Sequence, residues 1–353
     1  MGTPTITKGN QHSSSTLYEG NGTAIGSGGK TISGLSFKPD LVWIKNRDAT
    51  DDHSLFDSSR GVTKLLETTT SPYAETTQTE SLTSFTGSGY TLGSLAQVNT
   101  SSESFVSWNW KANGGTTASN TNGSITSTVQ ANTTAGFSIV TYSGSDASTV
   151  TWGHGLSSSP EWVLIKRREG NGWRTYHTSV GLGSYLSITN SNGPTTSSTD
   201  FASVSSTTFG VKGGNNPVSA SSQTYVAYCW HGVEGFSKFN TYTGNGNADG
   251  PFTYTNFKPA WVMIKRTDSA GDWCILDNKR NAINPADNVL KANLSAIEDD
   301  DANMAIDFVS NGFKIRGAGS DGDNINASGG TYVYMAFAEA PFFGDGVSPV
   351  TAR

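Results

Sequence analysis

The sequence has few charged residues and very little cysteine. Charged residues make up 15% of the 353 positions, and the formal net charge is −6. With only 23 Lys plus Arg and no basic stripe, the chain lacks the positive surface that a nucleic-acid partner requires. The two cysteines, Cys229 and Cys274, each lie among aromatic residues in expected strands. We therefore expect two buried free thiols and no disulfide.

Long apolar runs are also missing. No stretch approaches the roughly 18 apolar residues that are needed to cross a bilayer. The opening MGTPTITKGNQHSSST has neither the charged region nor the apolar region of a signal peptide. We therefore expect no membrane insertion and a mature chain that begins near Met1, which also disfavours a secreted bacterial adhesin.

The chain is rich in aromatic and hydroxyl side chains. It has 9 Trp, 12 Tyr and 16 Phe, and hydrophobic residues make up 34% of it. This aromatic content, together with the low net charge, argues against disorder. Abundant Thr, Ser, Val and aromatic residues favour short strands joined by tight turns. The composition predicts an all-β protein, and the length suits two or three domains.

One phrase occurs three times along the chain. It reads PDLVWIKNR at 39–47, PEWVLIKRR at 160–168 and PAWVMIKRT at 259–267. Proline is tolerated at a strand entry because the first residue need not donate a ladder hydrogen bond. The apolar run that follows is typical of a buried strand. We interpret the phrase as the opening strand of a repeated β module.

The repeat extends on both sides of this phrase. A Gly-rich turn precedes each copy, as in TYTGNG at 241–246, and an aromatic strand closes it. The closing strands are SFVSWNWKA at 104–112, TYVAYCWHG at 224–232 and TYVYMAFAE at 331–339. Strand signals separated by turn residues favour a sandwich or jelly roll. The sequence thus predicts three tandem β-sandwich repeats of jelly-roll or lectin-like type.

The predicted boundaries follow from these anchors. The repeats run from 16 to 113, 136 to 233 and 236 to 343, after a polar N-terminal arm at 1–15 and before a C-terminal tail at 344–353. Residues 114–135 are polar and of low complexity, which suits a spacer. SITSTVQ within them alternates well enough to form an added strand. We expect the second and third repeats to pack together and the first to be freer.

Metal and cofactor sites have little support. No pair of histidines has the spacing of a zinc site. Two acidic clusters are weak calcium candidates, because neither has the ligand and glycine pattern of a calcium loop. Their residues are Asp299, Asp300, Asp301, Asp321 and Asp323. We expect these to be solvated turns, with no bound metal and no cofactor.

Catalytic and sugar-binding candidates are equally weak. The G-x-S-x-G nucleophile motif is absent, so we expect no serine hydrolase. Trp173, Tyr176 and Trp273 could stack on a sugar ring if exposed, but Trp173 and Trp273 occupy matching positions, which favours packing. Two Asp/Arg pairs recur three residues apart and are interpreted as loop-bracing ion pairs; they are Asp57 with Arg60 and Asp277 with Arg280.

The ordered motifs resemble a repeat of virion proteins of tailed phages, many from marine hosts, known as tail fibre or structural proteins. The motifs are TYTGNG at 241–246, FKPAWVMIKR at 257–266, LFDSSRG at 55–61, GYTLG at 89–93 and TYVAYCWHG at 224–232. The ending PVTAR at 349–353 also resembles endings in that group. The resemblance covers nearly the whole chain past residue 16.

This resemblance implies a structural virion protein, and first of all a tail fibre or receptor-binding component. It implies an extracellular particle assembled in the host cytoplasm, other virion proteins as partners, and a host surface glycan or protein as ligand. A homo-oligomer, with a trimer favoured, is expected because weak sites gain avidity by multiplicity. Residues 1 to about 30 are expected to dock on the particle, and loops 169–173 and 317–330 to meet the host.

Two alternatives stay open at this point. One is a capsid decoration or head fibre protein. The other is a glycan-active enzyme module, which is disfavoured because no acidic pair recurs in the copies, as paired glycosidase carboxylates would require. We expect a protein that is not an enzyme.

Overall fold

The computed structural model describes residues 5–69, 74–215, 217–318 and 323–341. The prediction of an all-β protein is confirmed, because nearly every element in these ranges is a strand of an antiparallel sheet. The helices are short: α1 (Ala96–Asn99), α2 (Asp323–Asn326), and the 3-10 helices η1 (Gly9–Gln11), η2 (Ile25–Ser27) and η3 (Ala302–Met304). Among the described residues, no helix has the length and apolar character needed to span a membrane.

Three groups of sheets follow one another along the chain, and we call them the first, second and third units. Each unit has a six-stranded sheet and a three-stranded sheet. In the first unit the large sheet has the order β1 (Ser13–Glu19), β9 (Ser104–Trp110), β3 (Leu41–Asn46), β4 (Ser54–Asp57), β5 (Lys64–Glu67) and β6 (Thr76–Thr77). Its small sheet consists of β2 (Lys30–Ile32), β8 (Gly89–Leu92) and β7 (Leu82–Thr86).

The third unit has the same strand order as the first. Its large sheet runs β21 (Ser237–Thr243), β29 (Thr331–Pro341), β23 (Phe257–Arg266), β24 (Trp273–Asp277), β25 (Asn288–Lys291) and β26 (Asp299–Asp300). Its small sheet consists of β22 (Phe252–Tyr254), β28 (Gly312–Ile315) and β27 (Ile306–Val309).

The second unit differs at the two ends of its large sheet. That sheet runs β10 (Ala118–Asn120), β11 (Ser127–Asn132), β12 (Phe137–Ser143), β20 (Thr224–Trp230), β14 (Trp162–Arg167) and β15 (Arg174–His177). The small sheet consists of β13 (Val150–Gly153), β19 (Thr208–Val211) and β18 (Phe201–Val204), and a hairpin pairs β16 (Ser184–Tyr185) with β17 (Thr195–Thr196).

In every unit the strand of the repeated phrase lies beside the aromatic closing strand. The register also corresponds: Leu41 pairs with Trp110, Trp162 with Trp230, and Trp261 with Phe337. Side chains alternate between the two faces of a strand. In β3, Val42 and Ile44 therefore face a core shared with the small sheet of the same unit, and Trp43 faces the other side.

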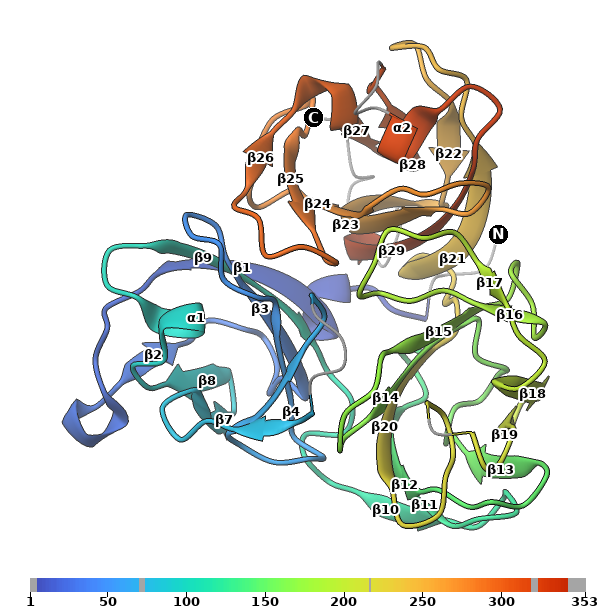
Figure 1. Ribbon diagram of the computed structural model, residues 1–353. Coiled ribbons are helices and arrows are strands. Elements are labelled where there is room, and N and C mark those ends of the chain that lie inside the picture. The colour runs from blue at the N-terminus through green and yellow to red at the C-terminus, as the bar shows by residue number, and fades with distance from the viewer. Residues whose placement is uncertain (1–4, 70–73, 216, 319–322, 342–353) are drawn as a thin grey trace.

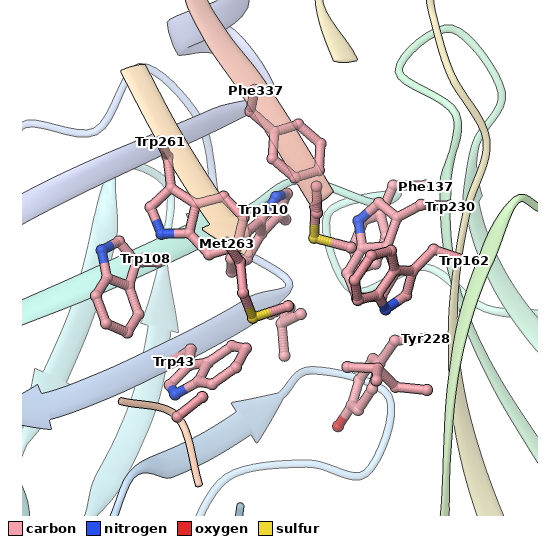
Figure 2. Close-up of a cluster of buried hydrophobic side chains, with 14 of the residues drawn as sticks. Trp43, Trp108, Trp110, Phe137, Trp162, Tyr228, Trp230, Trp261, Met263 and Phe337 are labelled. Carbon is pink, nitrogen blue, oxygen red and sulfur yellow. The ribbon is translucent and has the colours of Figure 1, made fainter. Parts of the chain in front are cut away.

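The other faces of the three large sheets meet in one tryptophan-rich centre. Every tryptophan except Trp152 belongs to this cluster. Figure 1 shows the three units around it, and Figure 2 shows the side chains that converge there. The Trp110 ring of the first unit lies 6.2 Å from Trp230 of the second and 5.6 Å from Trp261 of the third, centroid to centroid. Since aromatic rings at these separations attract one another beyond their simple burial, the centre ties all three units together.

The strand expected within SITSTVQ is confirmed as β11, which together with β10 extends the second large sheet beyond β12. Alternation explains this, because Ser127 and Val129 are buried while Thr128 is exposed. The polar residues 114–135 are therefore more than a spacer, and one further expectation needs correction. The first unit is not freer than the others, since Trp43, Trp108 and Trp110 all pack in the centre.

The N-terminal segment is likewise packed rather than loose. Ile6 is 3% exposed and belongs to the central cluster. Gly9 approaches the backbone of Ala338 so closely that a Cβ there would lie 2.1 Å from its carbonyl oxygen. β1 already begins at Ser13, inside the expected arm 1–15. The expected tail 344–353, with PVTAR, lies outside the described residues.

Candidate functional site

The aromatic residues considered for sugar stacking are not available to a ligand. Trp173 and Trp273 are 0% exposed and Tyr176 is 3% exposed. Trp173 Nε1 donates to the Glu67 carbonyl of the first unit (2.8 Å), and Trp273 Nε1 donates to the Ser187 carbonyl of the second (3.0 Å). The matching positions of the two tryptophans therefore reflect equivalent contacts between neighbouring units. The packing role favoured from the sequence agrees with this burial, and the weaker sugar-stacking alternative does not.

The acidic candidates do not form a metal site in the described part of the chain, where no group of three or more His, Cys, Asp or Glu side chains could hold an ion. Asp299 and Asp300 make up β26, and the Asp301 side chain caps η3 by accepting from Asn303 N (2.9 Å). Asp323 begins α2. Asp321 lies outside the described residues.

The loops expected to meet the host are only partly outward-facing. In 169–173, the Asn171 carbonyl accepts from the buried Lys166 ammonium, and Trp173 points into the centre. In 317–330, Ile325 and Asn326 are buried, and residues 319–322 lie outside the described ranges. Two lysines at the same strand positions, Lys45 and Lys265, also donate to loop carbonyls, which explains why a lysine follows the apolar run of each repeated phrase.

The Asp/Arg pairs lie at boundaries between units. Asp57 and Arg60 are in contact with no exposed side-chain surface, and Arg280 Nε lies 2.6 Å from Asp277 Oδ2 in the same surroundings. Each aspartate also accepts a hydrogen bond from a side chain of the neighbouring unit across the boundary. Asp57 accepts from the Tyr228 hydroxyl of the second unit (2.7 Å).

At the other boundary, Asp277 accepts from Trp108 Nε1 of the first unit (3.0 Å). Burial alone would raise the pKa of Asp277, but the Arg280 charge and the donated hydrogen bonds hold that pKa below its ordinary value. These pairs therefore do more than brace a single loop, because they anchor a carboxylate toward the neighbouring unit.

A glutamate links each pair to an arginine of the adjoining unit. At the first–second boundary, Glu75 accepts from Arg60 Nη1 (2.9 Å) and takes two hydrogen bonds from Arg168, at 2.9 and 2.7 Å. At the third–first boundary, Glu298 accepts from Arg280 Nη1 (3.0 Å) and takes two from Arg47, at 2.9 and 2.6 Å. Two-point Arg–carboxylate contacts are among the strongest polar contacts in proteins.

The backbone repeats the pattern at these two boundaries. Glu75 N donates to the Arg168 carbonyl (2.7 Å), and Glu298 N donates to the Arg47 carbonyl (2.9 Å). We call each set an ion cluster: Asp57, Arg60, Glu75 and Arg168 form the first, and Asp277, Arg280, Glu298 and Arg47 form the second. Neither glutamate belongs to a repeated phrase, so no motif predicted these contacts.

The second–third boundary has none of these charges at the equivalent positions. Trp162 pairs with His177 as Trp261 pairs with Asp277, so His177 stands where the other units have aspartate. Val180 stands at the position of Arg60 and Arg280 in the other units. Thr267 is the last residue of the third repeated phrase, at the position where the other two phrases have arginine. Pro194 precedes β17 as Glu75 precedes β6, and proline has neither a carboxylate nor an N–H to donate.

An open cleft lies at this boundary in place of an ion cluster. It holds about 450 Å³ and is lined by residues of both units. We call it the hydroxyl cleft, and its lining consists of Ser179, Val180, Ser184 and Pro194 from the second unit with Thr241, Tyr242, Thr243, Thr267, Thr331 and Val333 from the third. The three replaced positions Val180, Pro194 and Thr267 are all part of it.

A different contact holds the second and third units together beside the cleft. The Ser191 carbonyl of the second unit accepts from Gly271 N (2.8 Å) and from Lys265 Nζ (3.0 Å). The second and third units are therefore joined by this loop contact and by the tryptophan-rich centre.

Comparison with known proteins places the chain in a family without assigning it an activity. No curated protein and no solved structure matched the chain. One family model, described as a domain of unknown function (DUF7483), matches residues 8–341 and therefore spans all three units. The protein belongs to the DUF7483 family.

Proposed function

We propose that the protein is a structural component of a tailed-phage virion, with a tail fibre or receptor-binding position preferred over a capsid decoration position. The proposal rests on the resemblance of its ordered motifs to repeats of such proteins. It includes three tandem β-sandwich copies of one module, supported by the shared strand order of the first and third large sheets and by the corresponding registers in all three.

The structural observation that supports the proposal, beside this resemblance, is the closed arrangement of the three units in one chain. Each unit contributes one sheet face to the tryptophan-rich centre, and two of the three boundaries are locked by ion clusters whose Asp/Arg pairs are buried. Loss of one unit would expose the apolar faces of the other two, so the chain should unfold as a whole. Such a rigid body suits a particle surface, where it would carry loops outside the cell without disulfide support.

Particle composition tests this proposal directly. Mass spectrometry of density-purified phage particles should detect the chain, and immunogold labelling with an antibody against the purified protein should mark the tail. Label over the capsid would favour the decoration alternative. A chain that is made during infection but is absent from purified particles would refute the virion role.

Several copies per particle are part of the proposal, and a homotrimer is the favoured assembly. Light scattering on the purified protein should then give about three times the 37.2 kDa of one chain. A single-chain mass both free and on the virion would contradict it. Contact with the particle should involve surfaces other than Ile6, because that side chain already packs in the centre.

A further inference from the structure

Among the described residues, the hydroxyl cleft is a boundary position that leaves room for another molecule and has no charged side chain in its lining, whereas the groove between the first and third units is lined in part by Lys279 and Glu339. The tryptophan-rich centre has only about 10 Å³ of free space beside Trp110 and Phe337, about the room of a single water. The groove at the first–second boundary contains the charged Glu75 and Arg168, and a groove within the second unit contains Arg168. By contrast, the cleft of about 450 Å³ falls within the size range of small-molecule sites.

We propose that the hydroxyl cleft binds a neutral saccharide unit. Of the described residues that line it, none carries a charge. An ionic ligand would lose its hydration there without gaining a partner of opposite charge, which is costly. At the other two boundaries the equivalent space is taken by arginine together with a glutamate, whereas here the glutamate position is Pro194.

The lining matches the chemistry of a sugar. Six of the lining residues have aliphatic hydroxyls: Ser179, Ser184, Thr241, Thr243, Thr267 and Thr331. The Thr267 hydroxyl lies 2.8 Å from the Thr331 hydroxyl, so these two share a hydrogen bond. A hydroxyl both donates and accepts, so the array, with the other four hydroxyls, complements a ligand whose own hydroxyls do the same. Val180, Pro194 and Val333 supply apolar surface for ring C–H groups.

Strand geometry fixes the spacing of this array. Thr243 pairs with Thr331, and Thr241 pairs with Val333, on neighbouring strands β21 and β29. Residues opposite each other in this way have Cβ atoms about 5 Å apart, and alternate residues of one strand point to the same face. Thr241, Thr243 and Thr331 therefore form a rigid, exposed patch of hydroxyls on one sheet face.

Ligand-observed NMR on the full chain provides the test. We expect saturation transfer to at least one neutral sugar among glucose, galactose, mannose and N-acetylglucosamine, with a millimolar dissociation constant, and none to glucuronate or glucosamine. The double variant Thr241→Val/Thr243→Val keeps the shape of the strand and should weaken binding about 10-fold, because two hydrogen bonds are lost. Thr128→Arg, placed in the groove of the second unit, is the matched control and should bind like the wild type.

A second variant fills the cleft. Pro194→Glu with Thr267→Arg rebuilds the pair found at the other boundaries and should abolish sugar binding without lowering the melting temperature. Absence of transfer to every neutral sugar, equal binding of charged sugars, or binding unaffected by both double variants would overturn the proposal. The assay uses purified protein, so its outcome is independent of whether the chain is found in virions.

Discussion

Arg168 and Glu75 are 93 residues apart in the sequence and are joined by two hydrogen bonds, from Nε at 2.9 Å and Nη2 at 2.7 Å. Glu75 is also held by Arg60, which lies against Asp57. The same arrangement recurs around Glu298, and its partner Arg47 is 251 residues away. Both of these buried Asp/Arg pairs thus lie where units of one chain meet.

The first prediction concerns the strength of this contact. Arg168→Ala should lower the free energy of unfolding by about 1 to 2 kcal/mol, because a two-point contact to a largely buried carboxylate is lost. Lys314→Ala is the control, since Lys314 pairs with Asp249, whose side chain is 84% exposed. That change should cost less than about 1 kcal/mol. Equal losses in urea denaturation would contradict the importance of the boundary contact.

The second prediction concerns the stability of the folded protein at low pH. Burial would raise the pKa of Glu298, but hydrogen bonds and charge from Arg47 and Arg280 bring it below its ordinary value. A carboxyl group with a lowered folded pKa adds stability above its unfolded pKa of about 4, and that stability is lost as the pH falls through the folded value.

Glu298→Gln should therefore reduce stability at pH 7 and flatten its decline in acid. Denaturant midpoints measured at several pH values below 5 would show both effects. A decline as steep as that of the wild type would show that Glu298 is not responsible.

The third prediction concerns His177, which replaces aspartate at the second–third boundary. Burial lowers its pKa to about 4. Since the unfolded chain binds this proton near pH 6.5 and the folded chain does not, stability falls as the pH drops from 6.5 to 4, by up to about 3 kcal/mol. His177→Asn should remove this part of the pH dependence. An unchanged slope between pH 7 and 5 would contradict the assignment.

The fourth prediction concerns the thiols, which the structure confirms as buried and unpaired. Burial raises the pKa of Cys274 to about 12 and raises that of Cys229 as well. A thiol reagent at pH 8 should therefore modify neither residue in the folded protein and both in denaturant. Rapid labelling of either thiol under native conditions would show that its unit opens locally.

The strand phrases were enough to predict an all-β chain and the opening and closing strands of each copy, because alternation and proline at a strand entry are local signals. That these two strands pair side by side was not predicted. The partners of Asp57 and Asp277 were not predictable, since Tyr228 and Trp108 lie on other units. Trp173 and Trp273 looked like possible exposed rings for the same reason, as the neighbouring unit that covers them is distant in sequence. The hydroxyl cleft has no local motif, and only the comparison of three boundaries reveals it.

The closed tryptophan-rich centre also has a consequence for biosynthesis. Trp110 can contact Trp261 and Phe337 only after the third unit has left the ribosome. For the same reason, Arg47 can form its hydrogen bonds only after Glu298 has been synthesised. Contacts between such distant residues form late and slowly. Until then the nascent first and second units present a bare aromatic face, which is a hazard for aggregation. Chains that stop before β29 should therefore accumulate as insoluble material, and efficient production should depend on chaperones that shield this face.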